Sequence, residues 1–150
     1  MSFGDPGRDE ENVVPSHADK DPRDALRGLH VLVVDDDEDT REMLRQILTH
    51  AGALVSTAAG GEAALGILRN VAADVVISDL SMPRHDGHWV VRNLRALDGR
   101  QGKVPAIAVT AYRETQHEAE ALAAGFDAYL EKPLDFRQLI DTIRRVVRVP

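Results

Sequence analysis

Cysteine is absent from this 150-residue chain, and aromatic residues are scarce, with one tryptophan, two tyrosines and three phenylalanines. Without cysteine the chain can form no disulfide, no thiolate zinc site and no cysteine nucleophile. No stretch approaches the roughly 20 apolar residues that a membrane-spanning helix needs, so we expect no membrane partner. The formal net charge of −7 argues against a nucleic-acid partner, because such proteins present a basic face to the phosphates.

The first 28 residues differ in composition from the rest of the chain. They hold seven acidic residues, four basic residues and three prolines, and they show almost no apolar periodicity. This composition is typical of a disordered extension or a linker, so we expect residues 1–28 to form one and residues 29–150 to form the domain. The segment is either a tether to a partner or a solvated leader. It is polar and acidic, unlike a signal peptide, and we expect a cytoplasmic location.

Short apolar runs alternate with stretches of helical periodicity from residue 29 onward. The runs predict strands at residues 31–34, 54–57, 75–77, 106–109 and 128–130, and the continuous apolar run at 31–34 suits a strand that is covered on both faces. The amphipathic stretches predict helices, at residues 39–50, 61–70, 89–97, 114–124 and 136–147. Strict alternation of strand and helix predicts an α/β fold, with a five-stranded parallel sheet and helices on both of its faces.

Polar residues follow the carboxyl ends of four of these predicted strands. Asp35 and Asp36 follow the first strand, Asp79 the third, Thr110 the fourth and Lys132 the fifth. Sites in such folds lie outside the carboxyl ends of the strands. We therefore expect these five side chains, which are distant in sequence, to meet on one edge of the sheet.

Three of these residues are acidic, and their convergence predicts a metal site. Carboxylates that lie close together repel each other, and a hard divalent cation relieves the repulsion. Magnesium prefers oxygen ligands and needs few of them from the protein. We expect Asp36 and Asp79 to bind Mg²⁺ directly, Asp35 to bind it directly or through water, and the backbone carbonyl of Ser81 to supply a further oxygen.

The same residues favour phosphoryl-transfer chemistry. A carboxylate can attack phosphorus and form an acyl phosphate, and Asp79 at the end of the third strand is the expected nucleophile. The transferred group spreads negative charge over its oxygens, so it needs cations and hydrogen-bond donors around it. Besides the metal, the Lys132 ammonium and the Thr110 hydroxyl would bind these oxygens.

Four motifs in this order resemble the receiver domain of two-component response regulators. They are Val33-Val34-Asp35-Asp36, Ser78-Asp79-Leu80-Ser81-Met82-Pro83 with Asp86-Gly87, Val109-Thr110-Ala111, and Lys132-Pro133. The resemblance spans about residues 29 to 148 and implies a flavodoxin-like, doubly wound (βα)5 fold. It matches Asp79 with the phosphoacceptor, Asp35 and Asp36 with the acidic metal pair, Thr110 with the switch hydroxyl and Lys132 with the phosphate-binding lysine.

The resemblance also implies partners and a switch. The phosphodonor would be a histidine kinase or a phosphotransfer protein, and the target would be a downstream protein. The chain itself would be a monomer or weak dimer and would not be an enzyme. Tyr129 matches the switch aromatic residue, which would turn inward as Thr110 moves toward the phosphoryl group and so reshape the face formed by residues 114–147. The Lys132–Pro133 peptide bond matches one that is usually cis. Ser81 and Tyr112 match positions that tune the phosphoryl lifetime, but one is small and one bulky, so no lifetime follows.

Two other functions are compatible with parts of the sequence. Residues 31–40 loosely resemble the opening of haloacid-dehalogenase phosphohydrolases, with Asp35 as the nucleophile, but a cap insertion and a late acidic pair are not apparent. A domain that keeps the fold without switching is the other alternative. Whether the chain acts alone or belongs to a larger kinase or regulator stays open.

Several residues are assigned structural roles only. The acidic run after Asp36 does not fit a calcium loop, since Thr40 stands at the sixth position and Gln46 at the twelfth. We expect Asp39 to cap the helix that follows. The histidines, among them His85, His88 and His117, lack metal-ligand spacing and are expected at the surface.

Overall fold

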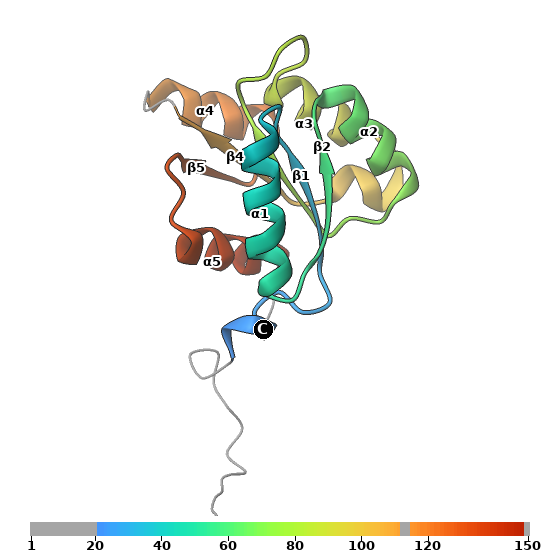
Figure 1. Ribbon diagram of the computed structural model, residues 1–150. Helices are drawn as coiled ribbons and strands as arrows, with labels where there is room; N and C mark the ends of the chain where they lie inside the picture. Colours follow the sequence, from blue (N-terminus) through green and yellow to red (C-terminus); the bar gives the residue numbers. More distant parts are fainter. Residues whose placement is uncertain (1–20, 112–114, 149–150) are drawn as a thin grey trace, which may run out of the picture.

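The protein, described here from a computed structural model for residues 21–111 and 115–148, contains one five-stranded sheet with helices on both faces (Figure 1). All strands are parallel, in the order β2-β1-β3-β4-β5. The strands are β1 His30–Val34, β2 Leu54–Ala58, β3 Val75–Asp79, β4 Ala106–Thr110 and β5 Ala128–Glu131. The helices are η2 Pro22–Asp24, α1 Glu38–His50, α2 Gly61–Asn70, α3 Gly87–Arg95, η3 Gly99–Lys103, α4 Thr115–Ala124 and α5 Phe136–Val147. The predicted flavodoxin-like fold class is confirmed.

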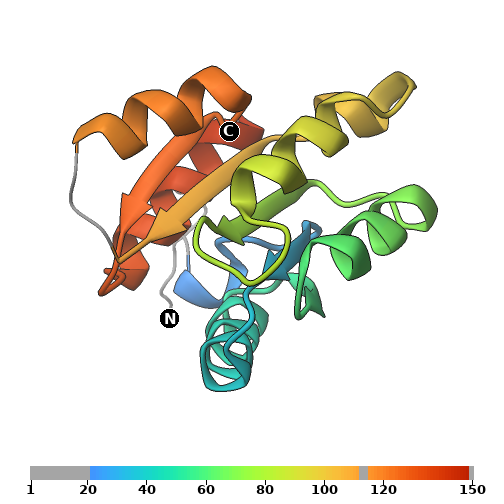
Figure 2. The same ribbon diagram turned by 90° about the horizontal axis from the view of Figure 1, so that it is seen from above.

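The two faces of the sheet are covered by different helices because side chains alternate along each strand. In β1, Val31 and Val33 pack with α1 and α5, whereas Leu32 and Val34 pack with α2, α3 and α4. Figure 2 shows α1 and α4 on opposite sides of the sheet. Both faces of β1, β3 and β4 are therefore buried, which explains their continuous apolar runs. Of the helices that the structure describes, none is both long enough and apolar enough to cross a membrane.

The register of the strands brings their carboxyl ends to one edge. Val34 lies opposite Ser78, and Asp79 lies opposite Val109. Thr110 in turn lies opposite Glu131. The residue after each strand consequently emerges at the same edge, beside the loop between β3 and α3 that stands at the top of Figure 1.

The start of α1 corrects one expectation. Asp37, not Asp39, is the N-cap, and its carboxylate accepts a hydrogen bond from the Thr40 backbone N–H at 2.9 Å. The reason lies two residues earlier: the Asp35 carboxylate accepts the Asp37 N–H at 2.9 Å and turns the chain out of the strand. Asp39 lies in the first turn of the helix, where its charge still favours the positive end of the helix dipole.

The residues that precede β1 pack on the domain. Leu26 is fully buried in the cluster under α1 and α5. Its backbone N–H donates to the Ala51 carbonyl at 2.8 Å, and the Arg144 guanidinium donates to the Ala25 carbonyl at 2.6 Å. Ala25 and Leu26 thus contact the domain, whereas residues 1–20 of the extension expected over residues 1–28 lie outside the described residues.

Candidate functional site

Three polar side chains are fixed at the carboxyl edge by backbone hydrogen bonds that extend the sheet beyond its strands. Asp35 directly follows β1, and its N–H donates to the Ala58 carbonyl at 3.1 Å. Lys132 directly follows β5, and its N–H donates to the Thr110 carbonyl at 2.8 Å. Asp79 is the last residue of β3, between these two strands. The positions of the three side chains therefore depend on the sheet rather than on flexible loops.

The carboxylates of Asp35, Asp36 and Asp79 form one acidic group, in which the candidate ligand oxygens all lie within 4.8 Å of one another. Asp35 is 3% exposed and Asp79 8%, whereas Asp36 is open to solvent. Two oxygens on opposite sides of a single Mg²⁺ lie about 4 Å apart, so small side-chain adjustments would bring all three into coordination. The oxygen donors, their charge and the open side at Asp36 all fit magnesium.

Lys132 contacts two of these acids directly. Its Nζ lies 3.1 Å from Asp35 Oδ2 and 3.3 Å from Asp79 Oδ2. The ammonium thus bridges the two buried carboxylates, as expected from its predicted place at the same edge of the sheet. A bound cation would take over part of this role and release the ammonium for another anion.

Burial and neighbouring charges both shift the pKa values of Asp79 and Lys132, and burial shifts the two pKa values in opposite directions. Burial raises the pKa of Asp79, aided by the nearby Asp35, while the Ser81 N–H, at 3.0 Å from Asp79 Oδ1, and the Lys132 ammonium oppose the rise. For Lys132, burial lowers the pKa, but Asp35 and Asp79 together outweigh it and the net pKa is raised. The lysine consequently carries its charge at neutral pH.

The loop after β3 is built around a close approach between Gly87 and the end of β3. A Cβ added to Gly87 would lie 2.6 Å from the Asp79 carbonyl oxygen and 2.9 Å from a Leu80 methyl group. Asp86 before it caps α3 by accepting the Trp89 N–H at 2.9 Å. Asp86-Gly87 therefore sets α3 against Asp79. The sequence signal was present, because an aspartate followed by glycine after a strand marks such a position.

The two predicted switch residues occupy different environments. Thr110 ends β4 and is 1% exposed. Tyr129 in β5 is partly buried and packs against the cluster under α2, α3 and α4. The peptide bond between Lys132 and Pro133 is cis. Tyr112, expected to influence the phosphoryl lifetime, lies outside the described residues.

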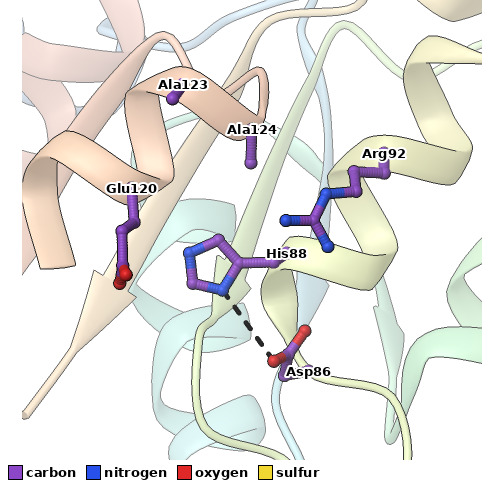
Figure 3. Close-up of a pocket in the computed structure, with 6 residues that line it drawn as sticks. All are labelled: Asp86, His88, Arg92, Glu120, Ala123 and Ala124. Atoms are coloured by element: carbon purple, nitrogen blue, oxygen red, sulfur yellow. Dashed lines mark ion pairs between the residues drawn. The ribbon is translucent and has the colours of Figure 1, made fainter.

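The histidines are not all at the surface. The His88 side chain is only 17% exposed and lies in a cleft of about 360 Å³ between α3 and α4. Figure 3 shows its ring between Asp86 and Glu120, and its Nε2 has no hydrogen-bond partner within the described part of the chain. The surface prediction was wrong for His88, because the position of α4 over α3 cannot be read from the sequence. The side chain of His117 lies outside the described residues.

Comparison with known proteins agrees with this geometry. The sequence profile of the response regulator receiver domain matches residues 31–144. An uncharacterized 14.6 kDa protein of Leptolyngbya boryana is 38% identical over 120 residues, which cover 80% of this chain and 91% of that protein. The response regulator MprA of Mycobacterium sp. (strain KMS) is 37% identical over 120 residues, 80% of this chain, but the match spans only 51% of MprA.

A solved structure provides a comparison for the acidic group. The receiver domain of the sensor histidine kinase PA1611 from Pseudomonas aeruginosa has a magnesium ion coordinated in its active-site cleft. It superposes with a TM-score of 0.74 at 27% identity, covering 81% of this chain and 98% of that one. The profile match covers most of the chain, and it identifies a signalling module rather than an enzyme. This chain belongs to the family of response regulator receiver domains.

Proposed function

We propose that this chain is a phosphoacceptor of a two-component phosphorelay, which takes a phosphoryl group onto Asp79 from a histidine kinase or a phosphotransfer protein. The observation that carries the proposal is the group of three carboxylates within 4.8 Å beside a lysine bonded to two of them. Because the chain belongs to the receiver family, we no longer favour the phosphohydrolase alternative, in which Asp35 would have been the nucleophile.

The roles of the residues follow from their positions. Asp35, Asp36 and Asp79 would hold Mg²⁺ together with the Ser81 carbonyl, and the bound ion supplies positive charge to the phosphoryl oxygens. One Asp79 oxygen forms a bond to phosphorus while the bond from phosphorus to the donor's histidine nitrogen breaks, and that nitrogen keeps the electron pair. Lys132, released from the carboxylates, binds a phosphoryl oxygen.

The consequence of phosphorylation would be carried by the face of α4, β5 and α5. Thr110 lies one residue past Val109, the partner of Asp79 across β3 and β4, so its hydroxyl can reach a group added to Asp79. Movement of Thr110 frees space for Tyr129 on the neighbouring strand. A cleft of about 460 Å³ that includes Glu118, Tyr129 and Gln138 joins the three elements. This supports a binding surface for a downstream protein that changes shape on phosphorylation.

Phosphoryl uptake tests the proposal directly. The protein is incubated with Mg²⁺ and acetyl phosphate, and the modified residue is located by mass spectrometry of peptides after reduction of the acyl phosphate. We expect the label on Asp79 and none in Asp79→Asn. A label on Asp35, or one that persists in Asp79→Asn, would contradict the assignment. The cytoplasmic location and the monomer or weak dimer stay predictions.

A further inference from the structure

A third cleft, of about 320 Å³, adjoins the acidic group at Asp36. Its other walls are the turn before α2, at Gly60 and Gly61, and the loop after β3, at Arg84 and His85. Lys132 approaches the acidic group from the opposite direction, since it follows β5 and the cleft lies toward β2, at the other edge of the sheet. The acidic group is thus flanked by a lysine on one side and by this cleft on the other.

The walls of the cleft are held together by close packing. The His85 ring stacks on the Trp89 ring, with centroids 3.8 Å apart and planes 14° from parallel. A Cβ on Gly61 would lie 2.9 Å from both His85 Cβ and the Trp89 ring. The loop after β3 therefore fits closely against the start of α2, so Arg84 is presented from a fixed support.

Arg84 itself has an unfavourable backbone conformation, with φ of 68°. The His85 N–H donates to the Pro83 carbonyl at 2.8 Å, which closes a tight turn around Arg84. Glycine adopts such a conformation without steric cost, whereas a Cβ makes it unfavourable. Arg148, the other described residue of this kind, caps the end of α5. Arg84 caps no helix, so the backbone gives no reason for an arginine there.

The guanidinium of Arg84 has no hydrogen bond or ion pair with any residue in the described ranges. Two carboxylates, Asp36 and Glu62, line the same cleft. Glu62 is directed to His85, with 3.7 Å between His85 Nε2 and its carboxylate. A guanidinium is suited to planar anions such as carboxylates and phosphates. Within the described residues this guanidinium is unpaired, and it lines the same cleft as Asp36 of the acidic group, so it is available to an anion that enters the cleft.

We propose that Arg84 is a donor-specificity residue, which binds the anionic leaving group of a small acyl phosphate in this cleft. The inference rests on the proposed function of Asp79 as phosphoacceptor. With acetyl phosphate, an Asp79 oxygen bonds to phosphorus, the bond from phosphorus to the acyl oxygen breaks, and acetate leaves with the electron pair. Negative charge grows on the leaving carboxylate, where Arg84 neutralises it, and no proton transfer is needed.

A donor with a nitrogen leaving group provides the contrast. When phosphoramidate reacts, the bond from phosphorus to nitrogen breaks and ammonia leaves with the electron pair, already carrying its protons. Ammonia has no negative charge for Arg84 to neutralise. The arginine should therefore accelerate transfer from acyl phosphates and leave transfer from phosphoramidate unchanged.

The test compares the two donors in four variants of the full chain. Arg84→Gln removes the charge, Arg84→Lys keeps it, and Arg84→Gly removes both the charge and the strained backbone. Arg69→Gln is the matched control, because Arg69 is an exposed arginine on α2 whose loss changes the net charge equally. Phosphorylation is followed by intact-protein mass spectrometry over a range of donor concentrations at saturating Mg²⁺, and Mg²⁺ binding is titrated separately by calorimetry.

We expect Arg84→Gln and Arg84→Gly to lower kcat/KM for acetyl phosphate about tenfold, the effect of one lost charge-assisted hydrogen bond. Transfer from phosphoramidate and the Mg²⁺ titration should not change, Arg84→Lys should recover part of the loss, and Arg84→Gly should raise the melting temperature. Equal slowing with both donors, the same loss in Arg69→Gln, or an unchanged preference in Arg84→Gln would overturn the inference while Asp79 remains the acceptor. Failure of both donors to label the parent would overturn the proposed function as well.

Discussion

Two cations at opposite ends of the sheet have equally exposed side chains, at 26% for both Arg95 and Lys132, yet they are bonded in opposite ways. Arg95, at the end of α3, donates to the carbonyls of Gly125, Gly102 and Val104 and to the Asp127 carboxylate, over distances of 2.6 to 3.0 Å. Among the residues that the structure describes, the Lys132 ammonium donates to two carboxylates, and both of them are candidate metal ligands.

The difference separates a structural cation, Arg95, from Lys132, for which we propose a functional role. Removing Arg95 would take the donor from three backbone carbonyls in two loops, which the guanidinium holds together. The carboxylates beside Lys132 can pair with a metal instead, and the ammonium can then pair with a phosphoryl group. Exposure alone does not distinguish these two cases, whereas the identity of the acceptors does.

Removal of the acceptor is the largest expected effect. Asp79→Asn should abolish phosphoryl uptake completely, because an amide cannot act as the nucleophile. Its melting temperature should stay close to that of the parent, since the change removes one of three clustered negative charges while Lys132 keeps Asp35 as a partner. Mass spectrometry measures uptake and circular dichroism the unfolding. A large loss of stability would show that Asp79 is needed for folding, which would contradict the distinction between the structural contacts of Arg95 and the functional group around Lys132.

Arg95→Ala should produce the largest loss of stability, about 2–4 kcal/mol, because three backbone carbonyls and the Asp127 carboxylate lose their donor. Chemical denaturation measures the change. The rate of phosphorylation of the folded protein should be unaffected, since Arg95 lies at the opposite end of the sheet. Arg100→Ala is the control: its side chain is exposed on η3, so the expected change is within about 0.5 kcal/mol.

Lys132→Ala should reverse this pattern, with a loss of activity greater than the loss of stability. We expect phosphorylation to slow about thirtyfold, which corresponds to one charge-assisted contact of about 2 kcal/mol. Stability should fall when Mg²⁺ is absent, because Asp35 and Asp79 lose their counter-charge, and Mg²⁺ should restore it. A deficit of the same size with and without Mg²⁺ would place Lys132 in the same class as Arg95.

Asp36→Ala should have the smallest effect on the folded protein and a clear effect on the metal. Asp36 is exposed, so stability without metal should change little. In the parent, Mg²⁺ at 100 times its Kd should stabilise the fold by about 2.7 kcal/mol, and most of this gain should be lost in the variant. Thermal unfolding at increasing Mg²⁺ measures it. An unchanged gain would exclude Asp36 as a ligand.

The sequence by itself determined the strands and the edge at which they meet. The run Val31-Leu32-Val33-Val34 is apolar at every position because both faces of β1 are covered. Its pattern therefore already indicated a sheet with helices on both faces. Given parallel strands, Asp35, Asp79 and Lys132 had to emerge on the same side. Only the tertiary structure decided what each side chain touches, because contacts depend on register and on the placement of helices.

Particular residues show this limit. Lys132 reaches Asp35 across 97 positions of sequence, His88 is covered by a helix that lies far along the chain, and Arg95 finds its carbonyls only after two separate loops have folded beside it. A local pattern reports which face of an element is buried, since burial acts on neighbouring residues in a fixed period. It carries no information on which distant group completes a hydrogen bond, because that depends on how whole elements pack.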